Sequence, residues 1–186
     1  MGSSNGGGTA VNSFALVSYL ADPLAGFLDR LRGEFAEECH AKAHITLLPP
    51  RPLVCDAALA WQTLRQRLHD VQPFHVELGA VEIFPVTQVI YISVKTGLAE
   101  LKLLHDALSC GQLAFEEPFA YHPHITLVQD LEPSQVAEAF RKTEVRWRDF
   151  PGPRSFTVDR LTFVQNTLEN RWTDLYSFPL TSKVAI

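Results

Sequence analysis

The sequence has few cysteines and no long hydrophobic run. Its 186 residues include three cysteines, Cys39, Cys55 and Cys110, none of them in a C-x-x-C motif. An odd number of scattered cysteines argues against a disulfide framework and favours reduced thiols in a cytoplasmic protein. No run of 18 apolar residues is present, so the sequence predicts no membrane-spanning helix. We therefore expect a cytoplasmic protein without a membrane partner.

Positive charge is also scarce. The chain carries 16 Lys and Arg residues against 21 Asp and Glu residues, for a formal net charge of −5. Proteins that coat nucleic acid depend on many cationic side chains that neutralise phosphates. The composition therefore disfavours an extended nucleic-acid surface, although it leaves room for a pocket that holds one phosphate.

The remaining composition is that of one globular domain, with 46% hydrophobic and 20% charged residues. A chain of this length buries roughly 70% of its unfolded surface and needs no disulfide or metal to hold a core. Residues 1–10 are polar and rich in glycine, unlike a signal peptide. We expect a flexible tail at 1–10, a single domain at 11–183 and, with no evident oligomer interface, a monomer.

Strand and helix patterns alternate along this domain. Strands are predicted at 12–20, 44–48, 74–84, 88–94, 124–128, 155–165 and 172–180, and helices near 23–38, near 57–70, after Gly97 and after Pro133. Pro49 and Pro50 are expected to end the second strand. Because the order strand, helix, strand, helix, strand occurs twice, we predict an α+β fold. Two pseudo-twofold-related, interleaved lobes would each carry a mainly antiparallel sheet with helices outside, around a central cleft.

The tetrapeptide His-Ile-Thr-Leu occurs at the same place in both halves, at residues 44–47 and 124–127. We call these segments the HITL motifs. Side chains two apart on a strand point to the same face, with Cα atoms about 6.7 Å apart. Each motif therefore presents a histidine and a threonine on one face and two aliphatic side chains on the other. If the halves face each other, both polar faces line one cleft.

Such a cleft suits phosphodiester chemistry that needs no metal ion. Imidazole titrates near neutral pH, so one histidine can act as a base while the other acts as an acid. Threonine hydroxyls can donate hydrogen bonds to the non-bridging phosphate oxygens. The candidate residues are His44, His124, Thr46 and Thr126, and the pattern calls for no cofactor.

Two H-x-T-x motifs 80 residues apart resemble those of the two-histidine phosphoesterase superfamily, in particular the RNA 2′,3′-cyclic phosphodiesterases, also called 2′-5′ RNA ligase-like proteins. Residues 12–180 share the resemblance, including the Phe84-Pro85 turn and Pro123 before the second motif. The resemblance implies that His44 is the proton donor and His124 the proton acceptor. It also implies that Thr46 and Thr126 bind phosphate, with an RNA end or a nucleotide cyclic phosphate as substrate and 2′-5′ ligation as the reverse reaction.

The sequence departs from this family at three positions. RNA-processing members often carry arginine where this chain has Gln88 and Gln129, and tryptophan where it has Tyr91. The missing cations favour a small cyclic phosphodiester over long RNA. Tyr91 lies on a strand face where it can stack on a base, or it can be a rim or core aromatic.

Other interpretations stay open at this stage. The protein can be a non-catalytic module that binds nucleotides or RNA ends on the same scaffold. His122 and His124 can be two zinc ligands on one strand face, although further ligands at a recognisable spacing are missing. Lys42 shares a face with His44 and can reach a phosphate, or it is an exposed lysine at the start of a strand.

Overall fold

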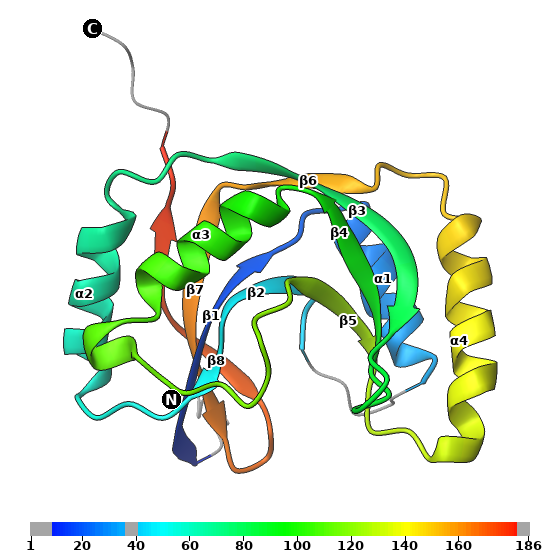
Figure 1. The fold of residues 1–186 in the computed structure, drawn as a ribbon, viewed down its shortest axis with the longest axis horizontal. Helices are drawn as coiled ribbons and strands as arrows, with labels where there is room; N and C mark the ends of the chain where they lie inside the picture. The colour runs from blue at the N-terminus through cyan, green and yellow to red at the C-terminus, as the bar shows by residue number, and fades with distance from the viewer. Residues whose placement is uncertain (1–8, 36–40, 182–186) are drawn as a thin grey trace, which may run out of the picture.

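The fold is built from two four-stranded antiparallel sheets (Figure 1). The computed structural model describes residues 9–35 and 41–181. The strands are β1 (Ala10–Tyr19), β2 (His44–Arg51), β3 (Phe74–Ile83), β4 (Ile90–Thr96), β5 (His124–Val128), β6 (Ser155–Val158), β7 (Arg160–Thr167) and β8 (Trp172–Pro179). The helices are α1 (Leu24–Gly33), α2 (Ala57–Leu68), α3 (Leu98–Leu108) and α4 (Pro133–Arg148), with a 3₁₀ helix at Gly111–Leu113. The α+β bilobal prediction is confirmed.

The strand orders of the two sheets, β2-β1-β7-β8 and β5-β4-β3-β6, reveal the internal repeat. The units β1-α1-β2 and β4-α3-β5 correspond, and in each unit the HITL strand lies at the sheet edge. Helix α1 packs against β5 and helix α3 packs against β2, so each helix supports the HITL strand of the other unit. The two HITL strands also contact each other, near the centre of Figure 1.

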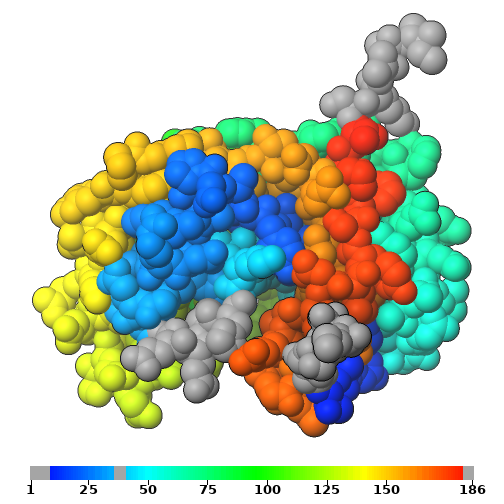
Figure 2. Space-filling model, turned by 180° about the vertical axis from the view of Figure 1, so that it is seen from behind, coloured from blue at the N-terminus to red at the C-terminus, as the bar shows by residue number. Residues whose placement is uncertain are grey.

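A single hydrophobic cluster joins the sheets. It includes Leu16 and Ile45 from the first sheet and Leu78 and Ile92 from the second. Helices α2 and α4 lie at opposite ends of the molecule (Figure 1). In the space-filling view from behind, the β2 region lies recessed between α1 and the β7–β8 hairpin (Figure 2). The lobes therefore share one core and form one folding unit.

The expectation that Pro49 and Pro50 end the second strand is wrong. Strand β2 continues to Arg51, and its register with β1 shifts between the pairs Phe14↔Arg51 and Leu16↔Leu48. Proline cannot donate a hydrogen bond to a neighbouring strand, but β2 is an edge strand and this shift accommodates one extra residue on β2.

The strand predicted at 155–165 is two strands that belong to different sheets. Strand β6 pairs with β3 and strand β7 pairs with β1 and β8. The chain changes sheets at Asp159, whose carbonyl accepts a hydrogen bond from the backbone N–H of Leu180 at 2.7 Å. In the first repeat the third strand, β3, lies in the second sheet, where it pairs with β4 and β6.

Several boundaries also differ from the sequence prediction. Helix α1 ends at Gly33, and residues 36–40, including Cys39, lie outside the described residues. Of the expected tail, residues 1–8 also lie outside them, whereas Ala10 already belongs to β1. Residues 182 and 183 of the expected domain lie outside as well. Cys55 and Cys110 are free thiols. Within the described ranges, no helix is long and apolar enough to cross a membrane.

The aliphatic side chains of the HITL motifs generate a stability prediction. Ile45 and Ile125 are both fully buried. Truncation of either to alanine removes buried methylene groups and leaves a cavity, so Ile45→Ala and Ile125→Ala each lower the free energy of unfolding by about 2–5 kcal/mol. Chemical denaturation measures this change. Val54→Ala is the matched control, since Val54 is 91% exposed, and losses no larger than the control's would contradict the account.

Candidate active site

The two HITL histidines occupy equivalent positions with equivalent hydrogen bonds. His44 begins β2 and His124 begins β5, and both side chains are half-buried. The Nδ1 atom of His44 lies 2.7 Å from the carbonyl oxygen of Lys42. The Nδ1 atom of His124 lies 2.6 Å from the carbonyl oxygen of His122. In each motif the imidazole is thus anchored by the backbone two residues before it.

These contacts determine which ring nitrogen is available for chemistry. A carbonyl oxygen only accepts hydrogen bonds, so Nδ1 must carry a proton in both histidines. In the neutral ring, Nε2 then holds the lone pair and can accept a proton. In the imidazolium, Nε2 carries a proton that it can donate. Either histidine can therefore act as acid or base through Nε2.

The pKa values of both histidines are held below the usual imidazole value. Burial lowers the pKa of His44, and the nearby Arg32 and His124 add to this effect. Burial also lowers the pKa of His124, with a further contribution from His122. In each case the hydrogen bond to the backbone carbonyl acts in the opposite direction without cancelling the shift. The neutral ring is consequently favoured in both positions at neutral pH.

Three observations indicate that the two motifs lie close together. Strands β2 and β5 contact each other, the charge of His124 lowers the pKa of His44, and the hydroxyl of Tyr121 donates a hydrogen bond to the carbonyl of Thr46 at 2.7 Å. Residues 44 and 124, far apart in the sequence, belong to one neighbourhood of the folded chain.

The two motif threonines follow the same pattern as the histidines. Strands β2 and β5 have the same burial order, half-buried, buried, half-buried, buried, buried, along their first five residues. Thr46 pairs with Val17 on β1, and Thr126 pairs with Tyr91 on β4. Among the described residues neither hydroxyl has a hydrogen-bond partner, so each is available to a bound oxygen.

Aromatic side chains pack around His124. The ring of Tyr91 lies 5.3 Å from that of His124 and stacks on Phe84 at 4.0 Å. Its hydroxyl donates to Glu82 at 3.0 Å, and burial together with this carboxylate raises the pKa of Tyr91 to about 12. Tyr91 is only 4% exposed. In this structure it therefore supports His124 and presents no open face on which a base could stack.

The surroundings of His44 carry more charge. The ring of Tyr19 meets His44 edge-on at 6.4 Å, and Lys42 Nζ lies 5.5 Å from the Tyr19 ring centre. The Tyr19 hydroxyl donates to Asp174 at 2.5 Å. The guanidinium of Arg32 donates to the carbonyl of Ala41 at 2.9 Å. Tyr19, Arg32 and Asp174 have no signal in the sequence, because only strand pairing and helix packing place them here.

The other candidates from the sequence lie at the edge of this arrangement. Gln88 sits in the β3–β4 turn with a φ of 56°, and the exposed Gln129 donates its side-chain amide to Asp130 at 3.0 Å. The rings of His122 and His124 are 6.3 Å apart. In the part of the chain that the structure describes, no group of three or more His, Cys, Asp or Glu side chains is arranged to hold a metal ion.

Comparison with known sequences identifies relatives of the chain. The model of the 2′-5′ RNA ligase superfamily matches residues 20–170. A protein of Oceanobacillus iheyensis named "Putative phosphoesterase" is 28% identical over 120 residues, which are 64% of this chain and 68% of the relative. A Bacillus anthracis protein of the same name is 29% identical over 142 residues, 74% of this chain and 78% of the relative.

Solved structures share the fold. The crystal structure of Escherichia coli LigT complexed with 3′-AMP has a TM-score of 0.63 at 18% identity, covering 92% of this chain and 99% of LigT. LigT complexed with NADP⁺ has a TM-score of 0.62 at 19% identity, covering 94% of this chain and all of LigT. A crystal structure described as a phosphoesterase has a TM-score of 0.61 at 18% identity, covering 92% of this chain and all of that chain.

The histidine geometry predicts a specific tautomer. Since Nδ1 of both His44 and His124 donates to a carbonyl, their neutral rings are expected to carry the proton on Nδ1. Nitrogen-15 NMR across a pH titration reports the tautomer and the pKa of each ring. We expect Nδ1–H forms and pKa values below about 6.5. An Nε2–H tautomer in either ring would contradict the arrangement.

Proposed function

The chain belongs to the 2′-5′ RNA ligase superfamily, and from this premise we propose that it hydrolyses 2′,3′-cyclic phosphates to 2′-phosphates. Membership supports a phosphoesterase activity. The observation that carries the finer proposal is the duplication of one site element. Two strands repeat the same sequence, the same order of burial and the same Nδ1–carbonyl hydrogen bond. A paired acid and base is what the opening of a cyclic phosphodiester requires.

The proposed reaction uses the Nε2 atoms of the two histidines. Neutral His124 accepts a proton from a water molecule as the water oxygen bonds to phosphorus. The bond between phosphorus and the ribose 3′-oxygen breaks, and protonated His44 donates its Nε2 proton to that oxygen. The products are a 2′-phosphate and a free 3′-hydroxyl. Proton exchange with solvent then returns both rings to their starting states.

The threonines and nearby cations stabilise charge in this proposal. Thr46 and Thr126 donate hydrogen bonds to the non-bridging oxygens, where negative charge accumulates in the transition state. Arg32, which acts on the pKa of His44, and Lys42 provide positive potential on the His44 side. Tyr91 contributes indirectly, because it packs against His124.

The charge distribution favours a small substrate. The net charge is −5, and Gln88 and Gln129 provide no positive charge on the His124 side. We therefore propose that the site binds one phosphodiester group, carried by a nucleotide or a short RNA end. If a ribose 5′-hydroxyl replaces water, the same assignment of acid and base yields a 2′-5′ phosphodiester and therefore a ligation.

The lack of positive charge at Gln88 and Gln129 also favours a second candidate function. The protein would then be a module that binds nucleotides or RNA ends without turnover. A panel of 2′,3′-cyclic nucleotides, assayed for both binding and hydrolysis, separates the two. Tight binding with no hydrolysis of any member would favour the binding module.

Removal of either histidine tests the catalytic proposal. His44→Ala and His124→Ala are each expected to lower kcat for a 2′,3′-cyclic nucleotide by about 10²–10⁴-fold, since each removes one proton-transfer group. The assay measures 2′-nucleotide formation in the presence of a chelator. His69→Ala serves as the control, because His69 is exposed at the end of α2. Undiminished product formation by the double variant His44→Ala/His124→Ala would contradict the proposal.

The lowered pKa values predict an acidic optimum. The kcat/KM value falls at low pH as His124 becomes protonated and falls at high pH as His44 loses its proton. Burial lowers both pKa values, so the bell-shaped profile of kcat/KM should centre below about pH 6.5. A profile with a single rising limb would argue against an acid–base pair.

A further inference from the structure

The hydrogen bond from Tyr121 to Thr46 connects the two HITL motifs directly. Tyr121 precedes His124 by three residues, and its hydroxyl lies 2.7 Å from the carbonyl oxygen of Thr46, in the other sheet. Strands β2 and β5 are both sheet edges and are not paired with each other. Backbone hydrogen bonds between them therefore cannot fix their separation. The bond from Tyr121 supplies a partner for an edge carbonyl and a fixed distance between the motifs.

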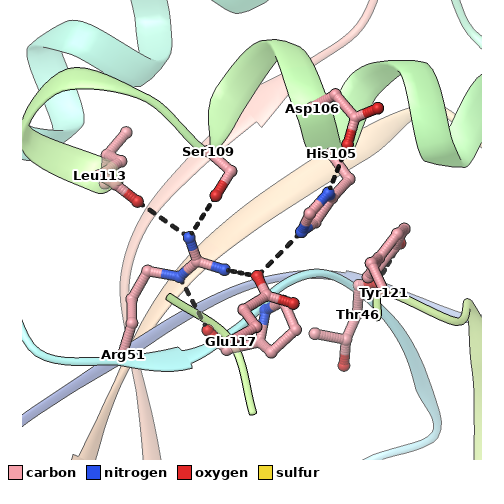
Figure 3. Close-up of polar contacts among 9 residues, drawn as sticks. Thr46, Arg51, His105, Asp106, Ser109, Leu113, Glu117 and Tyr121 are labelled. Atoms are coloured by element: carbon pink, nitrogen blue, oxygen red, sulfur yellow. Dashed lines mark hydrogen bonds and ion pairs between the residues drawn. The ribbon is translucent and has the colours of Figure 1, made fainter. Parts of the chain in front are cut away.

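The ring of Tyr121 is itself held by a histidine outside the HITL motifs. His105 of α3 stacks on Tyr121 with ring centres 3.9 Å apart and planes inclined by 6°. The Nε2 atom of His105 lies 2.9 Å from a carboxylate oxygen of Glu117, and its Nδ1 atom lies 3.0 Å from Asp106 (Figure 3). His105 is 8% exposed. Its orientation is thus fixed at both ring nitrogens.

The same Glu117 oxygen leads back to β2. Arg51, the last residue of β2 and 2% exposed, contacts this oxygen at 2.5 Å. Its guanidinium also donates to Ser109 Oγ at 3.0 Å and to the carbonyl of Leu113 at 2.8 Å (Figure 3). The contacts form a closed ring from Thr46 through Tyr121, His105, Glu117 and Arg51 to the same strand. The buried carboxylate of Glu117 is paired with the Arg51 cation and with His105, and these contacts give the closed ring of contacts a defined geometry.

From this ring of contacts we propose that Tyr121 is a positioning residue, which sets the separation of His44 and His124 by holding the two HITL strands together, with His105 as the support for its ring. The inference rests on the proposed function for its effect on rate. It concerns residues that the chemistry itself does not use. Burial, with the carboxylates of Glu117 and Asp106, raises the pKa of Tyr121 above its usual range, so the phenol stays protonated and remains a donor.

The variant Tyr121→Phe tests the proposal, because it removes the hydroxyl and keeps the stacked ring. Misplacement of catalytic groups by about 1 Å can cost about 10²-fold in rate. We expect kcat to fall by about 10–100-fold while KM changes by less than about threefold. In a His124→Ala background, Tyr121→Phe should cause no further loss, whereas a general loss of stability would lower the rate in both backgrounds. Tyr176→Phe on β8 is the matched control.

A second pair of variants applies if Tyr121→Phe does not fold. His105→Phe keeps an aromatic ring under Tyr121, whereas His105→Ala removes it. The proposal predicts that His105→Phe retains more of the wild-type kcat than His105→Ala. Equal rates in these two variants, at equal melting temperatures, would overturn the role of His105 as the support.

Crystal structures of the wild type and Tyr121→Phe separate this proposal from the proposed function. The distance between the Nε2 atoms of His44 and His124 should increase in the variant. An unchanged distance with an unchanged kcat overturns the positioning role. A wild type without turnover contradicts the proposed function, and the Nε2–Nε2 distance alone then decides whether Tyr121 positions the two rings.

Discussion

The direction of the polar side chains on the two HITL strands is determined by the burial of four aliphatic residues, Ile45, Leu47, Ile125 and Leu127. All four are at most 3% exposed, and a shift of one residue would expose them and bury the histidines and threonines in their place. Loss of buried aliphatic surface is costly, at about 25 cal/mol per Å². The alternation along each strand thus makes the orientation of the candidate site a consequence of core formation.

Core formation alone does not place the two polar faces together. Strands β2 and β5 belong to different sheets, and helices α1 and α3 each pack against the HITL strand of the opposite unit. The buried contacts of Glu117 with Arg51 and His105 add a polar connection between β2 and α3. Charge is distributed unequally over this frame. Arg32 and Lys42 lie toward His44, whereas aromatic rings surround His124. The two histidines therefore share a backbone geometry but differ in environment, which suits the proposed division into acid and base.

Local patterns in the sequence were sufficient for much of this account. Apolar alternation at 44–47 and 124–127 predicted both HITL strands and the shared face of His and Thr, and the duplicated order of elements predicted two lobes. The division at Asp159 was not predictable, because β-propensity does not report which sheet a strand joins. The prediction that Pro49 and Pro50 end the second strand was wrong for a similar reason, since only the topology makes β2 an edge strand. Tyr19, Arg32 and Tyr121 reach the site through long-range contacts, which no local pattern encodes.

The central claim is that the two HITL motifs grip one phosphate between them. A crystal structure of the protein with a bound nucleotide 2′-phosphate tests it most directly. The account predicts phosphate oxygens within about 3.2 Å of Nε2 of His44 and of His124, and of the hydroxyls of Thr46 and Thr126. A phosphate bound elsewhere, or one that contacts a single motif while the other points away, would contradict it.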